Sequence, residues 1–185
     1  KCFTTYRHAG RMMDDDSIIK ILEVTAEAGG ILMVHCENDT TLEYHLQKEI
    51  AQKHYEPIYH ARSRPPSAEN ISIQRIVDLM KEVKATVYIV HTSTAESVQI
   101  IQSARVQGLP IYNETCTHYL SLTEKKLEEK NGQLYICSPA LRSEKDNEAL
   151  WIGIANGCLD TVGSDDAGVP TADRIRLSQG RFDKV

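Results

Sequence analysis

The sequence predicts an α/β protein built on a parallel β-sheet. Apolar runs rich in β-branched residues alternate along the chain with segments whose apolar residues recur at helical spacing. Polar or reactive residues follow most of the apolar runs, at the points where the predicted strands end. In a parallel architecture all these strand ends open onto one face, which makes that face the place to look for function.

The first predicted unit is a surface helix followed by a strand. The acidic run 14–16 is suited to cap a helix, and Ile18, Leu22 and Ala26 give that helix an apolar stripe. Gly29 and the glycine after it end the helix, and the apolar run 31–35 then predicts the first strand.

Prolines divide the next part of the chain. A helical pattern covers about 40–54, and Pro57 together with the pair at 65–66 predicts an irregular segment over 56–66. A longer helix over 67–83 places Ile73, Ile76 and Met80 on one face.

The second half continues the alternation. A strand over 85–91 precedes a helix that Thr94 opens and Gly108 closes. The remaining predicted elements are a strand over 109–114, a helix over 123–130, a strand over 133–137, a helix over 143–156 and a strand over 159–165.

Three of the strand ends carry potential metal ligands. His35, His91 and Asp165 each follow an apolar run, although they lie more than fifty positions apart in the sequence. Parallel strands would bring the three side chains to the same face, where imidazole and carboxylate groups can bind one divalent ion. This repetition is the strongest functional signal in the chain, since a single histidine at a strand end is more often a packed or hydrogen-bonded residue.

Composition excludes several classes of function. The 185 residues are 41% hydrophobic and carry a formal net charge of −5, with 21 Lys and Arg against 26 Asp and Glu. The basic residues are scattered, so we expect no nucleic-acid partner. We also expect a cytoplasmic protein without a membrane partner, because no run is apolar enough to span a bilayer. The five cysteines are widely spaced and predict free thiols.

The spread of polar residues over successive strand ends favours a (β/α) barrel over a doubly wound sheet. A doubly wound sheet usually has one glycine-rich phosphate loop, and the sequence contains neither a GxGxxG nor a Walker pattern. Eight barrel units need about 250 residues, so the chain has too few strands to close a barrel. We therefore predict a partial TIM-type (β/α)8 barrel.

Seven short motifs extend over nearly the whole chain. They are KCFTTY (1–6), VHCEN (34–38), SRPP (63–66), VHTS (90–93), ETCTHYL (114–120), CSPALR (137–142) and GSD (163–165). In this order they resemble the motifs of the cyclic-amidohydrolase family, and most closely those of its D-hydantoinase and dihydropyrimidinase group. The resemblance implies a metal-dependent hydrolase that opens the ring of hydantoins or dihydropyrimidines, and a homo-oligomer, a tetramer in the family.

The resemblance also implies roles for individual residues. Lys1 matches the lysine that becomes carboxylated and bridges two divalent ions, usually zinc, while His35 and His91 match the ligands of the more exposed ion. Asp165 matches the aspartate that binds the buried ion and moves protons. Tyr6 matches the tyrosine that polarises the scissile carbonyl, and Ser138 matches a residue that holds the ring amide of the small-molecule substrate.

Two motifs of the family are missing. The family carries an HxH pair upstream of the lysine and a Pro-Asn-Gly segment downstream of the last residues seen here. We therefore expect residues 1–185 to be the central portion of a single barrel domain, truncated at both ends. We also expect this chain to lack a complete binuclear site and to be inactive by itself.

Other interpretations remain open. The motifs also suit an allantoinase or a dihydroorotase, although Tyr6 is typical of the hydantoinase group, and relatives without metal ligands serve as structural proteins. The sequence does not decide between hydantoins and dihydropyrimidines, nor the stereospecificity. Glu37 suits two roles equally, orienting His35 or forming a loop salt bridge. Arg64 and Arg142 are expected to anchor loops.

Overall fold

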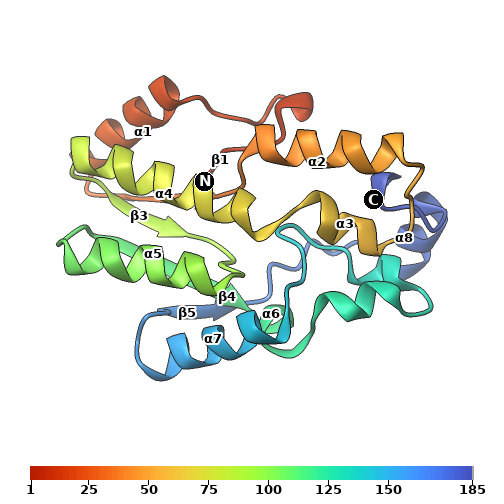
Figure 1. Cartoon of the computed structure of the whole chain (residues 1–185). Coiled ribbons are helices and arrows are strands. Elements are labelled where there is room, and N and C mark those ends of the chain that lie inside the picture. The colour runs from red at the N-terminus through yellow and green to blue at the C-terminus, as the bar shows by residue number, and fades with distance from the viewer. Residues whose placement is uncertain (185) are drawn as a thin grey trace.

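Five parallel strands form one sheet whose spatial order follows the order of the sequence (Figure 1). The structure, a computed structural model, describes residues 1–184. The strands are β1 (Cys2–Phe3), β2 (Ile31–His35), β3 (Thr86–Ile89), β4 (Ile111–Cys116) and β5 (Thr161–Gly163). Every neighbouring pair is parallel, and the order never reverses. A sheet that advances one strand at a time is the arrangement of a (β/α) barrel, since a doubly wound sheet reverses its order at a switch point.

Helices connect the strands and cover one face of the sheet. The helices α1, α4, α5 and α7 contact one another in that order, as Figure 1 shows. The α-helices are α1 (Asp15–Glu27), α2 (Asp39–Ala51), α3 (Ile58–Ser63), α4 (Pro66–Glu82), α5 (Ala95–Val106), α6 (Thr117–Ser121), α7 (Glu144–Ala155) and α8 (Thr171–Ser178). The 3₁₀ turns are η1 (Arg7–Ala9), η2 (Glu124–Glu128), η3 (Gly132–Tyr135) and η4 (Phe182–Lys184). Within residues 1–184 we find no helix with the length and apolar character to cross a bilayer.

Side-chain caps fix where the long helices begin. The side chains of Asp14, Asn38, Thr94 and Ser143 each accept a hydrogen bond from a backbone N–H in the first turn of α1, α2, α5 and α7. Such caps satisfy backbone donors that have no partner inside the helix. The α2 and α5 caps lie three residues beyond His35 and His91, so the same loops that carry the histidines also start the helices.

The two faces of the sheet differ in burial. Along β2, Leu32 and Val34 point into the helical layer and are buried, while Ile31 is 57% exposed and Met33 is 39% exposed. This alternation follows from the two-residue period of a strand. Together with Tyr112, which the strand register aligns with Met33, these exposed side chains form what we call the open face, which corresponds to the inside of a barrel.

One predicted strand is wrong. Residues 133–137 contain the turn η3 and do not join the sheet. Asn131 adopts a left-handed conformation, and Gly132 lies so close to Leu127 that a Cβ would clash with its carbonyl group. The chain therefore turns tightly here, and Ile136 packs into a small separate core.

Other elements differ in length or were missed. Strand β1 takes the place of the wrongly predicted strand in the five-stranded sheet. It is only two residues long, so it gives no periodic signal in the sequence. The predicted irregular segment contains the short helix α3, and the predicted helix over 123–130 is the turn η2. The remaining predicted helices and strands are confirmed within a few residues.

Candidate functional site

Three of the predicted site residues lie where strands end at one edge of the sheet. His35 is the last residue of β2, and His91 and Asp165 come two residues after β3 and β5. The backbone φ angles of Tyr6, His91 and Asp165 are 68°, 43° and 45°. Residues other than glycine seldom adopt this left-handed conformation. Each such residue costs about 1–3 kcal/mol and persists where the surroundings enforce it, often at functional sites.

The structure brings His35 and His91 into direct contact. His35 Nδ1 lies 2.9 Å from His91 Nε2, and the two rings are 4.6 Å apart at an interplanar angle of 73°. Both residues are 2% exposed. The Nδ1 atom of His91 is buried and has no hydrogen-bond partner in the described part of the chain. A buried imidazole nitrogen without a partner is uncommon.

Electrostatics favour the neutral form of His91. Burial first, and then the proximity of His35 and Lys1, lower the pKa of His91 well below its usual value. Neutral imidazole is the form that binds metal ions. His91 is therefore in the state that a ligand requires at neutral pH.

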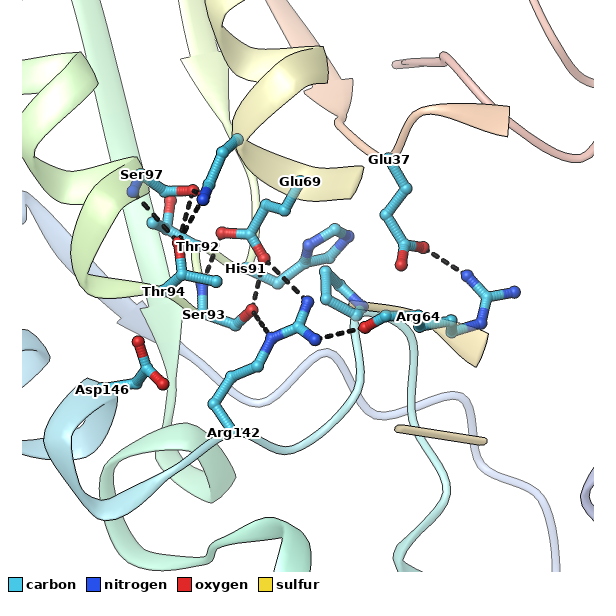
Figure 2. Close-up of polar contacts among 12 residues, drawn as sticks. Glu37, Arg64, Glu69, His91, Thr92, Ser93, Thr94, Ser97, Arg142 and Asp146 are labelled. Atoms are coloured by element: carbon cyan, nitrogen blue, oxygen red, sulfur yellow. Dashed lines mark hydrogen bonds and ion pairs between the residues drawn. The ribbon is translucent and has the colours of Figure 1, made fainter. Parts of the chain in front are cut away.

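Glu37 and Arg64 complete a buried ionic group around His35. The Oε2 atom of Glu37 accepts hydrogen bonds from His35 Nε2 at 2.9 Å and from Arg64 Nη1 at 2.5 Å. Figure 2 shows Glu37 and Arg64 facing each other. Burial disfavours the charged carboxylate, but the Arg64 guanidinium and the His35 hydrogen bond outweigh it and hold the pKa of Glu37 well below its usual range.

Arg142 connects this ionic group to a second loop. Its Nε atom donates to Ser93 Oγ at 3.0 Å, and its Nη1 atom donates to the carbonyl oxygen of Arg64 (Figure 2). Its Nη2 atom lies 3.5 Å from a carboxylate oxygen of Glu69. Arg142 is 3% exposed and closes the loop that begins at Ser138. The loops after β2 and β3 and the 138–142 loop are therefore held together by one buried network, and Arg64 and Arg142 anchor loops as predicted.

Tyr6, Ser138 and Asp165 line a cleft of about 640 Å³ next to the histidine pair. The ring of Tyr6 lies 5.2 Å from that of His35 and so joins the cleft to the buried histidines. Burial raises the pKa of Tyr6, although the Arg64 guanidinium and the Ser138 side chain partly offset this effect. Tyr6 therefore keeps its proton at neutral pH and can donate a hydrogen bond into the cleft.

Lys1 and Asp165 are less constrained than the histidines. Both residues are exposed. The Lys1 ammonium lies 5.6 Å from the centre of the Phe3 ring, and its charge acts on His91 and Cys116. The charge of Asp165 acts on Tyr6, Cys116 and His118. Both residues thus lie near the histidine pair or the cleft without being buried in either.

Comparison with known proteins shows which proteins share this sequence and fold. No family model matches the sequence. A D-hydantoinase from Ralstonia pickettii is 39% identical over 167 residues, which cover 89% of this chain and 36% of that protein. The D-hydantoinase of Bacillus sp. AR9 matches 100% of this chain and 41% of its own chain, with a TM-score of 0.95 and 36% identity. The chain is a homologue of the D-hydantoinases.

The similarity extends to proteins named for a second substrate class. The dihydropyrimidinase of Brevibacillus agri NCHU1002 has the same TM-score of 0.95 and 36% identity over the whole chain. The chain spans about two fifths of the length of these hydantoinase relatives. Its fold is accordingly a partial TIM-type barrel of the amidohydrolase superfamily, as the sequence predicts.

The histidine pair fits a metal ion of the kind that the resemblance implies. Two imidazole nitrogens that bind one Zn²⁺ at the usual lengths lie about 2.9 Å apart at a right angle and about 3.3–3.4 Å apart in a tetrahedral site. The facing nitrogens of His35 and His91 are 2.9 Å apart. Within residues 1–184, no three His, Cys, Asp or Glu side chains converge closely enough to hold an ion. The structure thus assembles two of the predicted ligands and leaves Lys1 and Asp165 outside that group.

His60 lines the same cleft of this hydantoinase homologue, although no local pattern around it indicates a buried environment. His60 Nε2 lies 2.7 Å from the carbonyl oxygen of Cys137, directly before Ser138. Burial, and then the positive charge of Arg64, lower the pKa of His60 to about 3. A neutral His60 therefore donates to this carbonyl group and helps to fix the start of the 138–142 loop.

Proposed function

We propose that the protein carrying this chain is a cyclic amidohydrolase that opens the ring of hydantoins or dihydropyrimidines. The observation that carries the proposal is the buried pair of His35 and His91 beside the cleft lined by Tyr6, Ser138 and Asp165. The similarity to D-hydantoinases over the whole chain supports it. Residues 1–185 would then form the central portion of one barrel domain, in a homo-oligomeric, cytoplasmic enzyme.

The proposal assigns the metal ligands by residue. His35 and His91 would hold one divalent ion, Asp165 would bind the other, and carboxylated Lys1 would bridge the two. Divalent ions at these positions, zinc by resemblance, would polarise the amide carbonyl and lower the pKa of water. The proximity of His91 to His35, and the effect of Lys1 on the pKa of His91, support this grouping.

The remaining chemistry belongs to side chains of the cleft. Tyr6 donates a hydrogen bond to the substrate carbonyl oxygen, which gains negative charge as water attacks the carbon. Asp165 takes a proton from the attacking water and passes it to the ring nitrogen as the C–N bond breaks. Ser138 binds the ring amide. Addition of one water thus yields an open-chain product with a new carboxylate.

Turnover of matched substrates tests the proposal. The protein at its natural length should hydrolyse dihydrouracil or a 5-substituted hydantoin, and a chelator should abolish the reaction until divalent metal is restored. Liquid chromatography of the ring-opened product measures both effects. Hydrolysis that persists after complete removal of metal would contradict the mechanism, and the absence of hydrolysis with all such substrates would contradict the proposed function.

A further inference from the structure

Both ring nitrogens of His35 are engaged by neighbouring side chains. Nε2 faces the Glu37 carboxylate at 2.9 Å, and Nδ1 faces His91 at 2.9 Å. An ionised carboxylate only accepts hydrogen bonds, so the proton of His35 must lie on Nε2. In the neutral imidazole, which is the form that binds metal ions, the Nδ1 atom then carries the lone pair, and this lone pair points toward His91.

Glu37 itself has little freedom to move. It is 0% exposed, and its backbone is held at both ends by Thr4, whose hydroxyl accepts from Glu37 N at 3.0 Å and donates to Glu37 O at 2.9 Å. Arg64 donates to the same carboxylate oxygen that His35 uses. Arg64 is held in turn through its carbonyl group, which accepts from Arg142. The acceptor for His35 is thus fixed by partners on three other segments.

We infer that Glu37, clamped by Arg64, is a positioning residue that keeps His35 in the tautomer whose Nδ1 lone pair can bind a divalent ion. The inference rests on the proposed function and goes beyond it, because Glu37 is neither a proposed ligand nor a residue that lines the cleft. Metal-binding histidines commonly donate their second ring nitrogen to a carboxylate, which orients the ring and increases its basicity. Of the two roles that the sequence left open for Glu37, the structure shows both contacts, the hydrogen bond to His35 and the salt bridge with Arg64.

The chain contains a matched control for this pair. Glu49 also accepts a hydrogen bond from a histidine, with its Oε2 atom 2.7 Å from His54 Nδ1. The side chains of Glu49 and His54 are 12% and 34% exposed. This second pair joins the end of α2 to the following loop and contacts none of the proposed ligands.

Metal affinity distinguishes the two pairs. We compare Zn²⁺ dissociation constants, by competition with a chromophoric chelator, for the wild type, Glu37→Gln and Glu49→Gln at natural length. Glutamine at position 37 can donate to His35 as well as accept, so it no longer enforces one tautomer. The Glu37→Gln variant should bind zinc about 10- to 100-fold more weakly. The Glu49→Gln variant should match the wild type.

A second measurement needs no variant and so does not depend on whether Glu37→Gln folds. Neutron diffraction of the metal-free wild type, exchanged into D₂O, should show deuterium on His35 Nε2. Deuterium on Nδ1 in its place would overturn the inference, as would equal zinc affinity of the wild type and Glu37→Gln. In both cases a zinc-binding, active wild type would leave the proposed function intact. A wild type that binds no divalent ion would overturn the proposed function and this inference with it.

Discussion

The two sides of the candidate site are built differently. At the ends of β2 and β3, His35 and His91 are 2% exposed and contact each other and Glu37. At the end of β5, Asp165 is exposed, although its backbone is as unusual as that of His91. Burial and hydrogen bonding therefore preorganise the histidine side. Within residues 1–184 no hydrogen bond or ion pair holds the Asp165 side chain, so its backbone conformation is what places it.

The largest expected effect tests whether both sides serve one reaction. His91→Ala and Asp165→Ala should each lower kcat/KM for a hydantoin by about 10³-fold or more, since each removes a ligand or the proton carrier. Thermal unfolding of the metal-free protein should separate them. His91→Ala should destabilise the fold, whereas Asp165→Ala should change stability by less than about 0.5 kcal/mol. Equal destabilisation by both would remove the difference between the two sides.

The next effect concerns the ionic group on the histidine side. Arg64→Met should leave the Glu37 carboxylate buried without its cation and cost about 3–5 kcal/mol in the free energy of unfolding. Arg7→Met provides the control, because Arg7 forms a comparable pair with Asp39 at 3.2 Å but its side chain is 66% exposed. That surface pair should contribute at most about 1 kcal/mol. Urea unfolding measures both, and similar losses would contradict the importance of burial.

A smaller effect appears as a dependence of stability on pH. The pKa of His60 is lowered to about 3 in the folded protein, so the unfolded chain binds more protons at this residue between pH 6.5 and 3. Stability should therefore fall as the pH falls through this window, by at most about 1.4 kcal/mol per pH unit. His60→Phe should reduce that slope, as measured by urea unfolding at several pH values. An unchanged slope would show that His60 is not buried in its neutral form.

The smallest expected effect is metal binding by the isolated 185-residue chain. Within residues 1–184 the histidines form only a two-ligand group, and the open face exposes apolar side chains. We expect at most one weakly bound ion per chain and no hydantoin turnover, because catalytic zinc usually has three protein ligands. Metal analysis after dialysis measures the first quantity. Two ions per chain together with turnover would contradict this expectation.

The sequence predicts the histidine side well because its signal is local. His35 and His91 each end an apolar run, and parallel pairing of the strands brings such ends together. Distant contacts carry no comparable signal. Arg64 reaches Glu37 across 27 positions from the turn between α3 and α4, and no local sequence pattern indicates where that turn packs. The spacing of the motifs indicates neither the ion pair of Glu37 and Arg64 nor its burial.

The wrongly predicted strand over 133–137 shows where a local sequence pattern misleads. Residues 133–137 have the apolar character of a strand, but the chain turns at Asn131 and Gly132. A local pattern does not reveal whether a neighbouring strand is available for pairing. For β1 the reverse holds, since two residues give no pattern and their pairing with β2 alone makes them a strand.

The left-handed backbone at Tyr6, His91 and Asp165 also has an evolutionary consequence. Glycine adopts such angles without steric cost, whereas each present side chain is kept against a local preference. His91→Gly should therefore unfold at a higher temperature than His91→Ala. At exposed Asp165, where little packing would be lost, a descendant released from selection for catalysis would gain stability by drifting to glycine, so retention of this aspartate in a lineage records continued use of its side chain.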